Sequence, residues 1–562
     1  FVLHLIPAQV VQSFYTYAWL DREGDEMGVR SQPLGVVTEG SFTGGLTVRL
    51  APDCPTEALR VGSFVVLEGN DNRYFSLIAD MRLRVTDPSL TAHPPAGGSP
   101  FVRQALAGTH TYATVEVRPS LMLENASKLT GAPPGPVRNI PMHFAVLREA
   151  RPEDFDLVFG SEGDTRFALG TPLTMDIPIP IDLKAFIERS NGIFGQSGTG
   201  KSVLTRLLLF GLIKSDVASA LIFDMHDEYA YAKRDPEIAG LVELFGESRV
   251  KVYTLDKRTG GSRDVVIGLN QIEPEDIELL ADELNLRETF PAVAHQLQQA
   301  FKSRWMQRLL AMDSEDVAEF CQQTGAHPGA VDALRQKLAL IRKRDYVVEE
   351  AGFSWVDDML HHIERGNHII LQFGRHDSLL DYMLVANIVF LLIHPGYTEK
   401  ALAAQADGAF GQEPRHLVIV LEEAHKFLTP EAARQSIFGT IAREMRKYSV
   451  TLLVVDQRPS SIDPDVLSQL GTRITGLLAD QRDIDAVLTG VGDRNQLRGM
   501  LASLEPRQQC LIVGHAIPMP MLLRTRQYDR ASLMAELRAS SKIRPIDGHE
   551  LLARYRSFDE DE

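Results

Sequence analysis

Residues Gly195-Gln196-Ser197-Gly198-Thr199-Gly200-Lys201-Ser202 match the pattern GxxxxGK[ST]. An apolar stretch at residues 193–194 precedes the match, and a helix-forming run at residues 203–212 follows it. A strand, a glycine-rich turn and a helix in this order predict a loop whose backbone N–H groups surround phosphate oxygens. We expect Lys201 to reach the β- and γ-phosphates of ATP, and Ser202 to bind Mg²⁺. The alternative is a plain glycine-rich turn, which the flanking strand and helix disfavour.

A second candidate site follows the apolar run at residues 417–421, which ends in Glu422 and Glu423. Ligands of open α/β sheets bind at the carboxyl edge of the strands. Neighbouring strand residues face opposite sides, so we expect the two acids to differ in role. We assign Glu422 to Mg²⁺ and Glu423 to polarising the attacking water. The alternative, a solvated start of a loop, loses weight because a phosphate loop lies upstream.

The pattern of residues 181–540 predicts an α/β fold around the phosphate loop, and the family resemblance given below implies that it is a RecA-like P-loop ATPase core. Helical patterns separate apolar β-type runs, which is typical of buried parallel strands. These runs are residues 192–194, 220–223, 251–255, 368–373, 417–421, 452–455, 473–478 and 509–513. At about residues 273–364 the pattern is almost wholly helical, with apolar positions 277, 280, 281 and 284 at helix spacing. We interpret this segment as an inserted helical subdomain.

Residues 1–180 follow a different pattern. Short β-type runs at 35–37, 46–50, 63–67, 76–81 and 112–118 alternate with clusters of Gly, Pro, Asn and Asp. This spacing predicts a small N-terminal β-barrel or sandwich. A proline-rich stretch at residues 172–180 is expected to link it to the α/β core. Residues 541–562 form a C-terminal tail, whose acidic tip is expected to be mobile.

Composition excludes several classes of protein. Hydrophobic residues make up 44% and charged residues 24% of the 562 residues, unlike collagen-like or disordered chains. Three widely spaced cysteines without a CxxC pair argue against a disulfide scaffold or a zinc site and favour a cytoplasmic location. No run of about twenty apolar residues occurs, so no membrane span is expected. The chain starts at Phe1 without a basic leader, which leaves room for a native N-terminus upstream. The net charge of −17 does not favour a nucleic-acid coat, yet it is compatible with a basic channel.

Four motifs resemble the HerA family of hexameric DNA translocases. They are the phosphate loop, FDMHDEY at residues 223–229, LEEAHKFL at 421–428, and REMRKYSVTLLVVDQRPSSIDPDVLSQLGTRI at 443–474. Their order and spacing across residues 189–474 make the resemblance specific. The β-rich N-terminal region and the helical insertion also lie where this family has a small barrel and an insertion.

The resemblance implies roles for individual residues. Asp224 and Glu228 match the acidic residues of the family's DxHGEY segment, near the nucleotide. Gln457 matches the polar sensor of SQRP, which reads the γ-phosphate. Arg446 matches the arginine of EGRK, a candidate finger that reaches a neighbour's ATP and stabilises developing charge. The alternative for Arg446 is a solvated position in a charged helical cluster, and Arg443 is the second candidate finger.

Three positions depart from the family motifs: Met445 and Asp227 replace glycines, and Asp456 replaces a serine. The residues that carry chemistry remain. Arg189 resembles a family arginine that contacts nucleotide or an interface, whereas we expect His425 to orient or pack rather than bind metal. The catalytic set is Glu423, Arg446, Gln457 and Lys201, and the metal set is Ser202 and Glu422. The nucleotide-binding set is Gly195, Ser197, Gly198, Thr199, Gly200, Lys201, Ser202, Asp224, Glu228 and Arg189.

The family resemblance implies an ATP-driven motor on double-stranded DNA, formed as a homo-hexamer. A partner nuclease of the NurA type would sit on the barrel face and act in DNA end processing. In the alternative, a HerA-like ring is the assembly platform and regulator of a toxic effector, sirtuin-type or nuclease, in antiphage defence. The missing membrane segments disfavour a secretion coupling ATPase, and the absence of a lid pattern disfavours a metabolic kinase. Basic segments at residues 256–263, 302–305 and 342–344 are candidate DNA contacts, or else solvated surface.

Overall fold

The computed structural model describes residues 33–92, 106, 109–124, 133–232, 237–256, 262–286, 289–352, 354–406, 413–431, 433, 437–492 and 494–539. The chain forms two compact units, Phe1–Arg151 and Pro152–Glu562. The predicted boundary at residue 180 is therefore corrected. The reason is that β8 (Arg166–Pro172) and β9 (Ile179–Asp182), in the supposed linker, belong to the large sheet of the second unit, where β8 pairs with β21 (Met521–Thr525).

The first unit is built on one antiparallel sheet of seven strands in the order β2-β1-β7-β3-β4-β5-β6. Its strands are β1 (Gly35–Ser41), β2 (Gly45–Leu50), β3 (Phe64–Glu68), β4 (Asn72–Val85), β5 (Thr111–Glu124), β6 (Gly135–Pro136) and β7 (Val146–Glu149). Because β2 also pairs with β5, six of these strands form a closed circuit of hydrogen-bonded neighbours. Alternate strand residues such as Val48, Val115 and Val117 are fully buried inside it.

The second unit is organised around a twelve-stranded mixed sheet in the order β13-β12-β16-β11-β17-β18-β10-β19-β20-β21-β8-β9. The remaining strands are β10 (Asn191–Phe194), β11 (Ser219–Asp224), β12 (Val250–Thr254), β13 (Arg263–Asp264), β16 (His368–Gln372), β17 (Leu417–Glu422), β18 (Val450–Asp456), β19 (Thr472–Thr475) and β20 (Gln509–Gly514). From β13 to β19 all neighbours are parallel, so their carboxyl ends meet at one edge. This edge carries the candidate site.

One strand direction predicted from the sequence is wrong. Residues 509–513 were expected to form a parallel strand, yet β20 pairs antiparallel with β19, Thr472 facing Gly514. The residues of β20 before Gly514 are buried, and burial on both faces gives a continuous apolar run whichever way the strand points. Periodicity alone therefore could not fix its direction.

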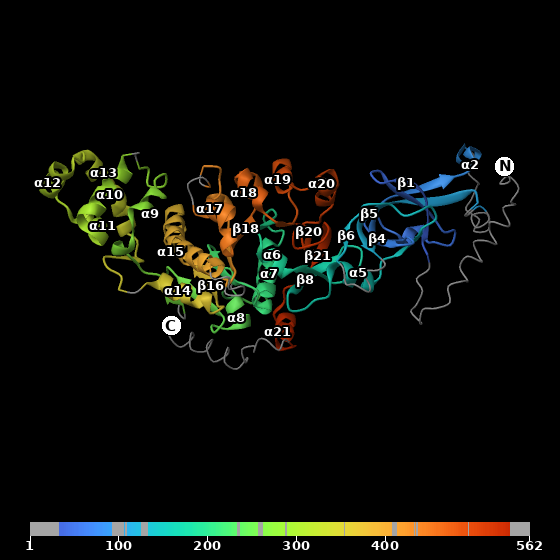
Figure 1. Ribbon diagram of the computed structural model, residues 1–562, viewed down its shortest axis with the longest axis horizontal. Helices are drawn as coiled ribbons and strands as arrows, with labels where there is room; N and C mark the ends of the chain where they lie inside the picture. The colour runs from blue at the N-terminus through green and yellow to red at the C-terminus, as the bar shows by residue number, and fades with distance from the viewer. Residues whose placement is uncertain are drawn as a thin grey trace. The chain divides into compact units, whose positions relative to one another are not determined.

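Helices of the second unit cover the sheet and form a separate helical body. They are α5 (Pro152–Phe159), α6 (Leu183–Ile187), α7 (Lys201–Ser215), α8 (Leu241–Phe245), α9 (Pro274–Glu278), α10 (Phe290–Phe301), α11 (Trp305–Ala311), α12 (Ser314–Thr324), α13 (Pro328–Arg342), α14 (Trp355–Glu364), α15 (Leu379–Ala406), α17 (Ile437–Glu444), α18 (Pro464–Gln469), α19 (Gln481–Val487), α20 (Arg494–Ala502) and α21 (Arg530–Ala539). Helices α10 to α13 lie together within the segment expected to be helical (Figure 1). Residues 277, 280 and 284 are buried as expected, although α9 already ends at Glu278.

Helix α15 is the one described helix that is long and apolar enough, by length and composition, to cross a membrane. About 65% of its most apolar window is buried inside the protein, which is typical of a core helix. Tyr382, Leu384 and Val385 of this helix belong to the main hydrophobic core. Of the other predictions, the C-terminal tail at residues 541–562 and most of the basic loop at residues 256–263 lie outside the described residues.

Candidate nucleotide site

The phosphate loop joins the carboxyl end of β10 to the first residue of α7, Lys201. Gly198 and Gly200 have φ values of 81° and 92°, in the left-handed region that favours glycine. The loop is held in place because Gln196 N donates to the Leu477 carbonyl at 3.0 Å. The helix that follows has fifteen residues, and its free N–H groups and dipole favour an anion at this end.

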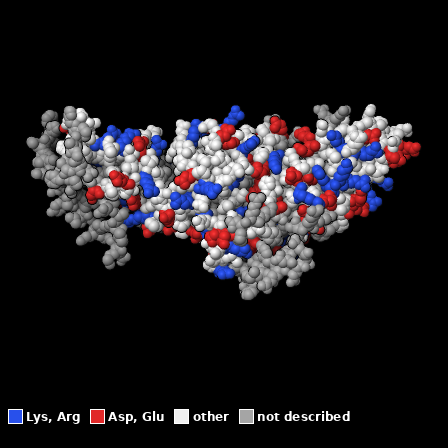
Figure 2. All heavy atoms as spheres, turned by 180° about the vertical axis from the view of Figure 1, so that it is seen from behind, with Lys and Arg blue, Asp and Glu red and all other residues white. Residues whose placement is uncertain are grey.

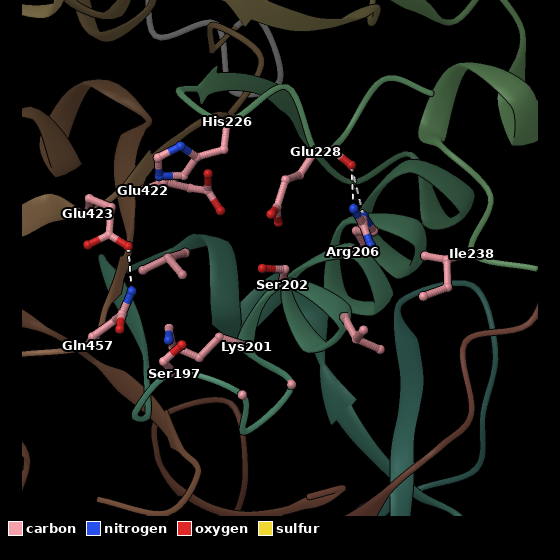
Figure 3. A pocket seen from close by; sticks show the side chains of 14 residues that line it. Ser197, Lys201, Ser202, Arg206, His226, Glu228, Ile238, Glu422, Glu423 and Gln457 are labelled. Atoms are coloured by element: carbon pink, nitrogen blue, oxygen red, sulfur yellow. Dashed lines mark hydrogen bonds between the residues drawn. The ribbon is translucent and has the colours of Figure 1, made fainter. Parts of the chain in front are cut away.

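A cavity of about 740 Å³ lies over this loop, and we call it the nucleotide cavity. It is lined by the phosphate loop and by side chains from three other strand ends (Figure 3). From the predicted set it brings together Ser197, Gly198, Gly200, Lys201, Ser202, Glu228, Glu422, Glu423 and Gln457. His226, Arg206 and Ile238 are also part of the lining.

Glu422 and Glu423 differ in environment, as the alternation of a strand requires. Glu422 is buried, and desolvation raises its pKa to about 8, with the nearby carboxylates adding to the effect. Its Oε1 accepts a hydrogen bond from the Tyr229 hydroxyl at 2.5 Å, while its buried Oε2 has no partner among the described residues. Glu423 has φ 46° and ψ 45°, an uncommon left-handed conformation that turns its side chain away from the strand.

Gln457 and Glu423 are in direct contact across the ends of β17 and β18. The Gln457 Nε2 donates to Glu423 Oε1 at 2.7 Å (Figure 3). Asp456 supports this contact from below, accepting from the His425 and Arg458 backbone N–H groups, both at 2.6 Å. The His425 ring also lies 3.0 Å from Asp456 and 3.5 Å from Glu423, and these partners raise the pKa of His425. His425 therefore contacts both acids, and its orienting role stays a prediction.

Lys201 lies at the opposite wall, in the first turn of α7. Its Nζ donates to the Gln196 carbonyl at 3.3 Å. Burial lowers the pKa of Lys201, whereas Glu423, Asp456, Glu422 and Glu228 oppose that shift. The cavity thus has the Lys201 ammonium and the N–H groups of the loop on one wall, and a cluster of carboxylates on the other. Such an arrangement suits a metal-bound polyphosphate between the two walls.

The donor set around Ser202 and Glu422 fits Mg²⁺. Both residues line the nucleotide cavity, and the unpartnered, buried Oε2 of Glu422 is a carboxylate oxygen without a ligand of its own. Mg²⁺ prefers oxygen ligands and usually keeps waters and substrate phosphates in its shell. No group of three or more His, Cys, Asp or Glu side chains suited to a metal occurs in the described ranges, so phosphate oxygens would have to complete the shell.

Comparison with known proteins shows a similarity to HerA helicases. The model of the HerA helicase central domain matches residues 167–391. The DNA double-strand break repair helicase HerA of Sulfolobus acidocaldarius is 23% identical over 518 residues, which are 88% of this chain and 94% of the relative. The chain is similar to HerA proteins in its central region and along most of its length. HerA of Pyrococcus furiosus is 20% identical over 421 residues, 69% of this chain and 73% of that protein.

The similarity to HerA agrees with the motif order. The ATP hydrolase class predicted from the sequence is confirmed. Among solved structures, the bacterial conjugative coupling protein TrwB has a TM-score of 0.43 at 12% identity. The likeness covers 67% of this chain and 92% of that protein. VirB4 of Thermoanaerobacter pseudethanolicus has a TM-score of 0.42 at 14% identity, covering 66% and 98%.

Two predicted arginines lie away from the nucleotide cavity. Arg446 precedes β18, and Arg189 precedes β10, so both lie at the amino ends of strands whose carboxyl ends form the site. Exposed Arg446 lines a separate cavity of about 260 Å³, which we call the amino-edge cavity, together with Glu188 and His416. Arg443, the second candidate, donates to the Ala433 carbonyl at 3.2 Å. A finger role for Arg446 thus requires the nucleotide of another subunit.

Three other predicted residues are displaced from the cavity wall. Asp224 is fully buried beneath it and accepts from Glu228 N at 2.7 Å and Tyr229 N at 3.0 Å, so it holds the turn rather than touching ligand. Burial raises the pKa of Asp224 to about 6. Thr199 turns inward, its hydroxyl donating to the Gln196 carbonyl at 2.8 Å. Gly195 contributes backbone at the start of the loop.

Tyr229 and Arg206 are functional residues that the sequence argument missed. Tyr229 carries the hydrogen bond to Glu422, and the Arg206 Nε donates to the Glu228 carbonyl at 3.1 Å. Arg206 lies one helical turn after Ser202, on the same face of α7. That i, i+4 spacing was the available signal for Arg206. The tyrosine of FDMHDEY was visible too, but nothing in the sequence says which way its hydroxyl points.

The basic segments proposed as DNA contacts are largely compensated. Arg304 pairs with Glu350 at 2.9 Å, Arg342 with Glu349 at 2.7 Å, and Arg344 with Asp381 at 2.9 Å. Trp305 is fully buried and donates to the Ile272 carbonyl. Figure 2 shows basic side chains of this unit interspersed with acidic ones on the visible face. These two segments lose support as a phosphate-binding surface.

Proposed function

We propose that this chain is the ATP-driven motor of a hexameric ring that moves double-stranded DNA and works with a partner nuclease in DNA end processing. The single observation that supports it most is the Glu423–Gln457 contact at 2.7 Å, facing Lys201 across the nucleotide cavity. A carboxylate in this place can take a proton from a water that attacks the γ-phosphate. Gln457 fixes the carboxylate and, once phosphate is present, can exchange that contact for the phosphate oxygen.

The other residues of the cavity divide the remaining tasks. Lys201 and the N–H groups of the loop hold the phosphate oxygens and offset their charge. Ser202 and Glu422 would hold Mg²⁺, which neutralises charge on the phosphates when bound. Glu422 is kept in place by Tyr229, so the side chain is oriented before any ligand arrives.

The location of Arg446 supports a site shared between subunits. Among the cavity-lining side chains, Arg206 is the arginine present, and its guanidinium is engaged with the Glu228 carbonyl. Arg446 is exposed at the other edge of the sheet, where a neighbouring subunit in a ring could bring it to ATP. An arginine supplied in trans stabilises charge on the transferred phosphoryl group and couples hydrolysis to ring geometry.

The relatives named above are DNA double-strand break repair helicases, and this supports DNA as the substrate of the motor. Exposed apolar side chains on the first unit support a protein partner there. Phe42, Met142 and Phe144 are 57%, 64% and 64% exposed, and the Phe144 N–H donates to Val37 of β1. Met142 and Phe144 lie two positions apart, and an exposed apolar patch often marks an interaction site.

The proposal is tested by ATPase assays with and without double-stranded DNA, combined with mass measurement of the assembly with and without ATP. We expect hydrolysis to rise with DNA and the ring mass to be that of six chains. Lys201→Ala and Glu423→Gln should abolish turnover, with ATP binding kept in the second variant. Unaltered hydrolysis in either variant would refute the site. Hydrolysis that ignores DNA but follows a bound effector protein would favour the antiphage platform instead.

A further inference from the structure

A buried arginine of β19 lies in the large sheet without an acid beside it. Arg473 is 3% exposed, and burial lowers its pKa to about 10, so the guanidinium remains charged at neutral pH. Among the described residues no carboxylate forms an ion pair with it, and its Nε is buried without a partner. Arginine is seldom fully buried unless it is paired. The charge of Arg473 therefore needs an explanation other than an ordinary ion pair.

The guanidinium instead holds the ends of two helices. Its Nη2 donates to the Leu467 carbonyl, in the last turn of α18, at 2.6 Å. Its Nη1 donates to the carbonyl of Val487, the last residue of α19, at 2.6 Å and to the Thr489 carbonyl just beyond at 2.5 Å. The carboxyl ends of helices carry partial negative charge, which favours a cation there. Arg473 thus bridges α18 and α19, which pack against each other (Figure 1).

These two helices hold the segment that follows the predicted sensor, Gln457. The Ser460 N–H donates to Oδ1 of Asp483, in the first turn of α19, at 3.0 Å. At the other end of the segment, the Asp463 side chain caps the start of α18. The Asp463 N–H donates to the Leu428 carbonyl, in the segment after β17, at 2.7 Å. The chain after Gln457 is therefore fixed both to α19 and to the start of α18.

The strand that carries Arg473 also supports the phosphate loop. β19 pairs in parallel with β10, which leads into the loop. Just after β19, the Gly476 N–H donates to the Phe194 carbonyl at 2.8 Å, and the Leu477 carbonyl accepts from Gln196 N at 3.0 Å. β19 is therefore tied to the phosphate loop by its backbone neighbours, and to the two helices of the sensor segment by the Arg473 side chain.

We propose that Arg473 is a positioning residue for ATP hydrolysis, which sets the place of Gln457 relative to the phosphate loop by bridging α18 and α19. The inference rests on the proposed function, in which Gln457 fixes Glu423 and reads the γ-phosphate. Arginine suits this task because its two terminal nitrogens reach the two helices separately and its planar group is rigid. A lysine keeps the charge but has one nitrogen, so it cannot bridge both helices in the same way. A neutral side chain leaves three carbonyls without their donor.

Arg473→Lys in the full-length protein tests the bridge while the buried charge is kept. We expect the kcat of Mg²⁺·ATP hydrolysis to fall about ten- to hundredfold, because a small displacement of a group in the site has an effect of this size. The KM for ATP should stay within about threefold of wild type, because the phosphate loop and Lys201 are unchanged.

Arg415→Lys is the matched control, at the amino edge of the same sheet. The Arg415 Nε donates to Ser219 Oγ at 3.0 Å and its Nη2 to the Asp216 carbonyl at 3.1 Å, so this guanidinium also bridges two groups of the chain. Arg415→Lys should lower the unfolding temperature as Arg473→Lys does, but it should leave kcat unchanged. An equal loss of kcat in both variants would mean general loosening of the sheet and would overturn the inference.

A double-mutant cycle with Gln457→Ala shows whether Arg473 acts through the sensor. If it does, Arg473→Lys should change the residual kcat of Gln457→Ala by less than about threefold. Losses that multiply, or an unchanged kcat in Arg473→Lys alone, would overturn the inference and leave the proposed function standing. Unaltered hydrolysis in Gln457→Ala would instead refute the role that the proposed function gives to Gln457.

Asp483 provides a second test, which leaves the buried charge in place. Asp483→Ala removes the acceptor of the Ser460 N–H, whereas Asp483→Asn keeps an acceptor oxygen. The alanine variant should lower kcat in the same way as Arg473→Lys, and the asparagine variant should stay within about threefold of wild type. If the two Asp483 variants hydrolyse ATP equally fast, α19 does not position the sensor segment, and the inference is overturned even where Arg473→Lys fails to fold.

Discussion

The Tyr229 hydroxyl lies 2.5 Å from Oε1 of Glu422, and both side chains are buried. Arg206 connects α7 to this tyrosine. The Arg206 guanidinium lies 5.8 Å from the Tyr229 ring and donates to the neighbouring Glu228 carbonyl. The P-loop helix, the FDMHDEY turn and the acid that ends β17 are thus connected by three side chains. Tyr229 is a positioning residue that leaves one oxygen of Glu422 available to the site.

Tyr229→Phe should weaken the affinity of the site for Mg²⁺ more than its affinity for ATP. Loss of one hydrogen bond to a charged or ionisable group costs about 1.5–3 kcal/mol, roughly ten- to hundredfold in an affinity. We expect the half-saturating Mg²⁺ concentration to rise by about tenfold, with metal-free ATP binding nearly unchanged. Titration of ATPase activity with Mg²⁺ measures this.

Tyr528→Phe is the matched control for this variant. Tyr528 is also buried and donates to a backbone carbonyl, that of Ala239, at 2.9 Å, but it does not line the nucleotide cavity. Both variants lose one buried hydrogen bond, so a purely structural effect should lower the unfolding temperature of each by a similar amount. If the Mg²⁺ dependence of Tyr229→Phe matches that of Tyr528→Phe, the positioning role is rejected.

Arg446→Ala should act on the neighbouring subunit. If Arg446 is supplied in trans, each variant chain silences the site next door as well as contributing a normal site of its own. Mixing Arg446→Ala with Glu423→Gln, each nearly inactive alone, should then restore ATPase activity, because a mixed ring contains sites that combine the intact Glu423 of one chain with the intact Arg446 of its neighbour. Pure variant should lose at least about a hundredfold, since such fingers contribute roughly 10³ or more.

Arg443→Ala serves as the comparison, because Arg443 is held by its own chain through the Ala433 carbonyl. Adding Glu423→Gln to this variant should give no gain in activity, because Arg443 completes no site of a neighbour. If mixtures of Arg446→Ala with Glu423→Gln recover no activity, Arg446 does not act on a neighbour's site.

The sequence predicted most of what lies at the carboxyl edge of the sheet. A glycine-rich loop between an apolar strand and a helix, and two acids after an apolar strand, are local patterns, and the nucleotide cavity joins them with Gln457. Asp224 belongs to the expected motif, but it does not lie on the cavity wall. Its carboxylate caps a turn beneath the cavity. Motif spacing says that a carboxylate is near, but not whether it faces ligand or backbone.

What the sequence could not predict depends on contacts between distant segments. Tyr229 and Glu422 are 193 positions apart, and only the pairing of β11 with β17 brings them together. Likewise, β8 and β9 carry proline and glycine like a linker, yet β8 joins the large sheet through β21, which is far along the chain. A count of basic residues likewise cannot predict which of them form ion pairs, as Arg304, Arg342 and Arg344 do.

The buried carboxyl of Asp276 should make stability depend on pH. Desolvation, with the charges of Glu273 and Glu275, raises the pKa of Asp276 to about 7, and its Oδ1 is buried without a partner among the described residues. A carboxyl with a raised folded pKa contributes stability below its unfolded pKa, near 4, which is lost as pH rises through 7. Asp276→Asn keeps the acceptor for Glu273 N and cannot ionise. The variant should unfold at a higher temperature than wild type at pH 8, with little difference at pH 4.5.

Asp316→Asn is the control, because Asp316 occupies the same capping position in α12 but is exposed. Its unfolding temperature should follow wild type at both pH values. Thermal unfolding of both variants and wild type at pH 4.5 and 8 checks this. If the difference in unfolding temperature between Asp276→Asn and wild type does not grow with pH, the pKa assigned to Asp276 is contradicted.

Two glycines in helices should respond oppositely to alanine. In an open helix position Gly→Ala stabilises by about 0.5–1 kcal/mol, because the unfolded chain loses freedom. Gly499 in α20 is exposed, and a methyl group added there would have no described atom within 4 Å, so Gly499→Ala should raise the unfolding temperature. Gly211 in α7 is buried, and a methyl there would lie 2.5 Å from the Phe167 ring.

The Phe167 ring cannot move away easily, because Phe210 lies 5.9 Å and the Arg526 guanidinium 5.4 Å from it. Gly211→Ala should therefore destabilise the second unit by about 1–3 kcal/mol, the usual cost of overpacking. Thermal unfolding of both variants and wild type shows directly whether each substitution raises or lowers the unfolding temperature. A higher unfolding temperature for Gly211→Ala would mean that α7 and β8 are packed less closely than the described contacts require.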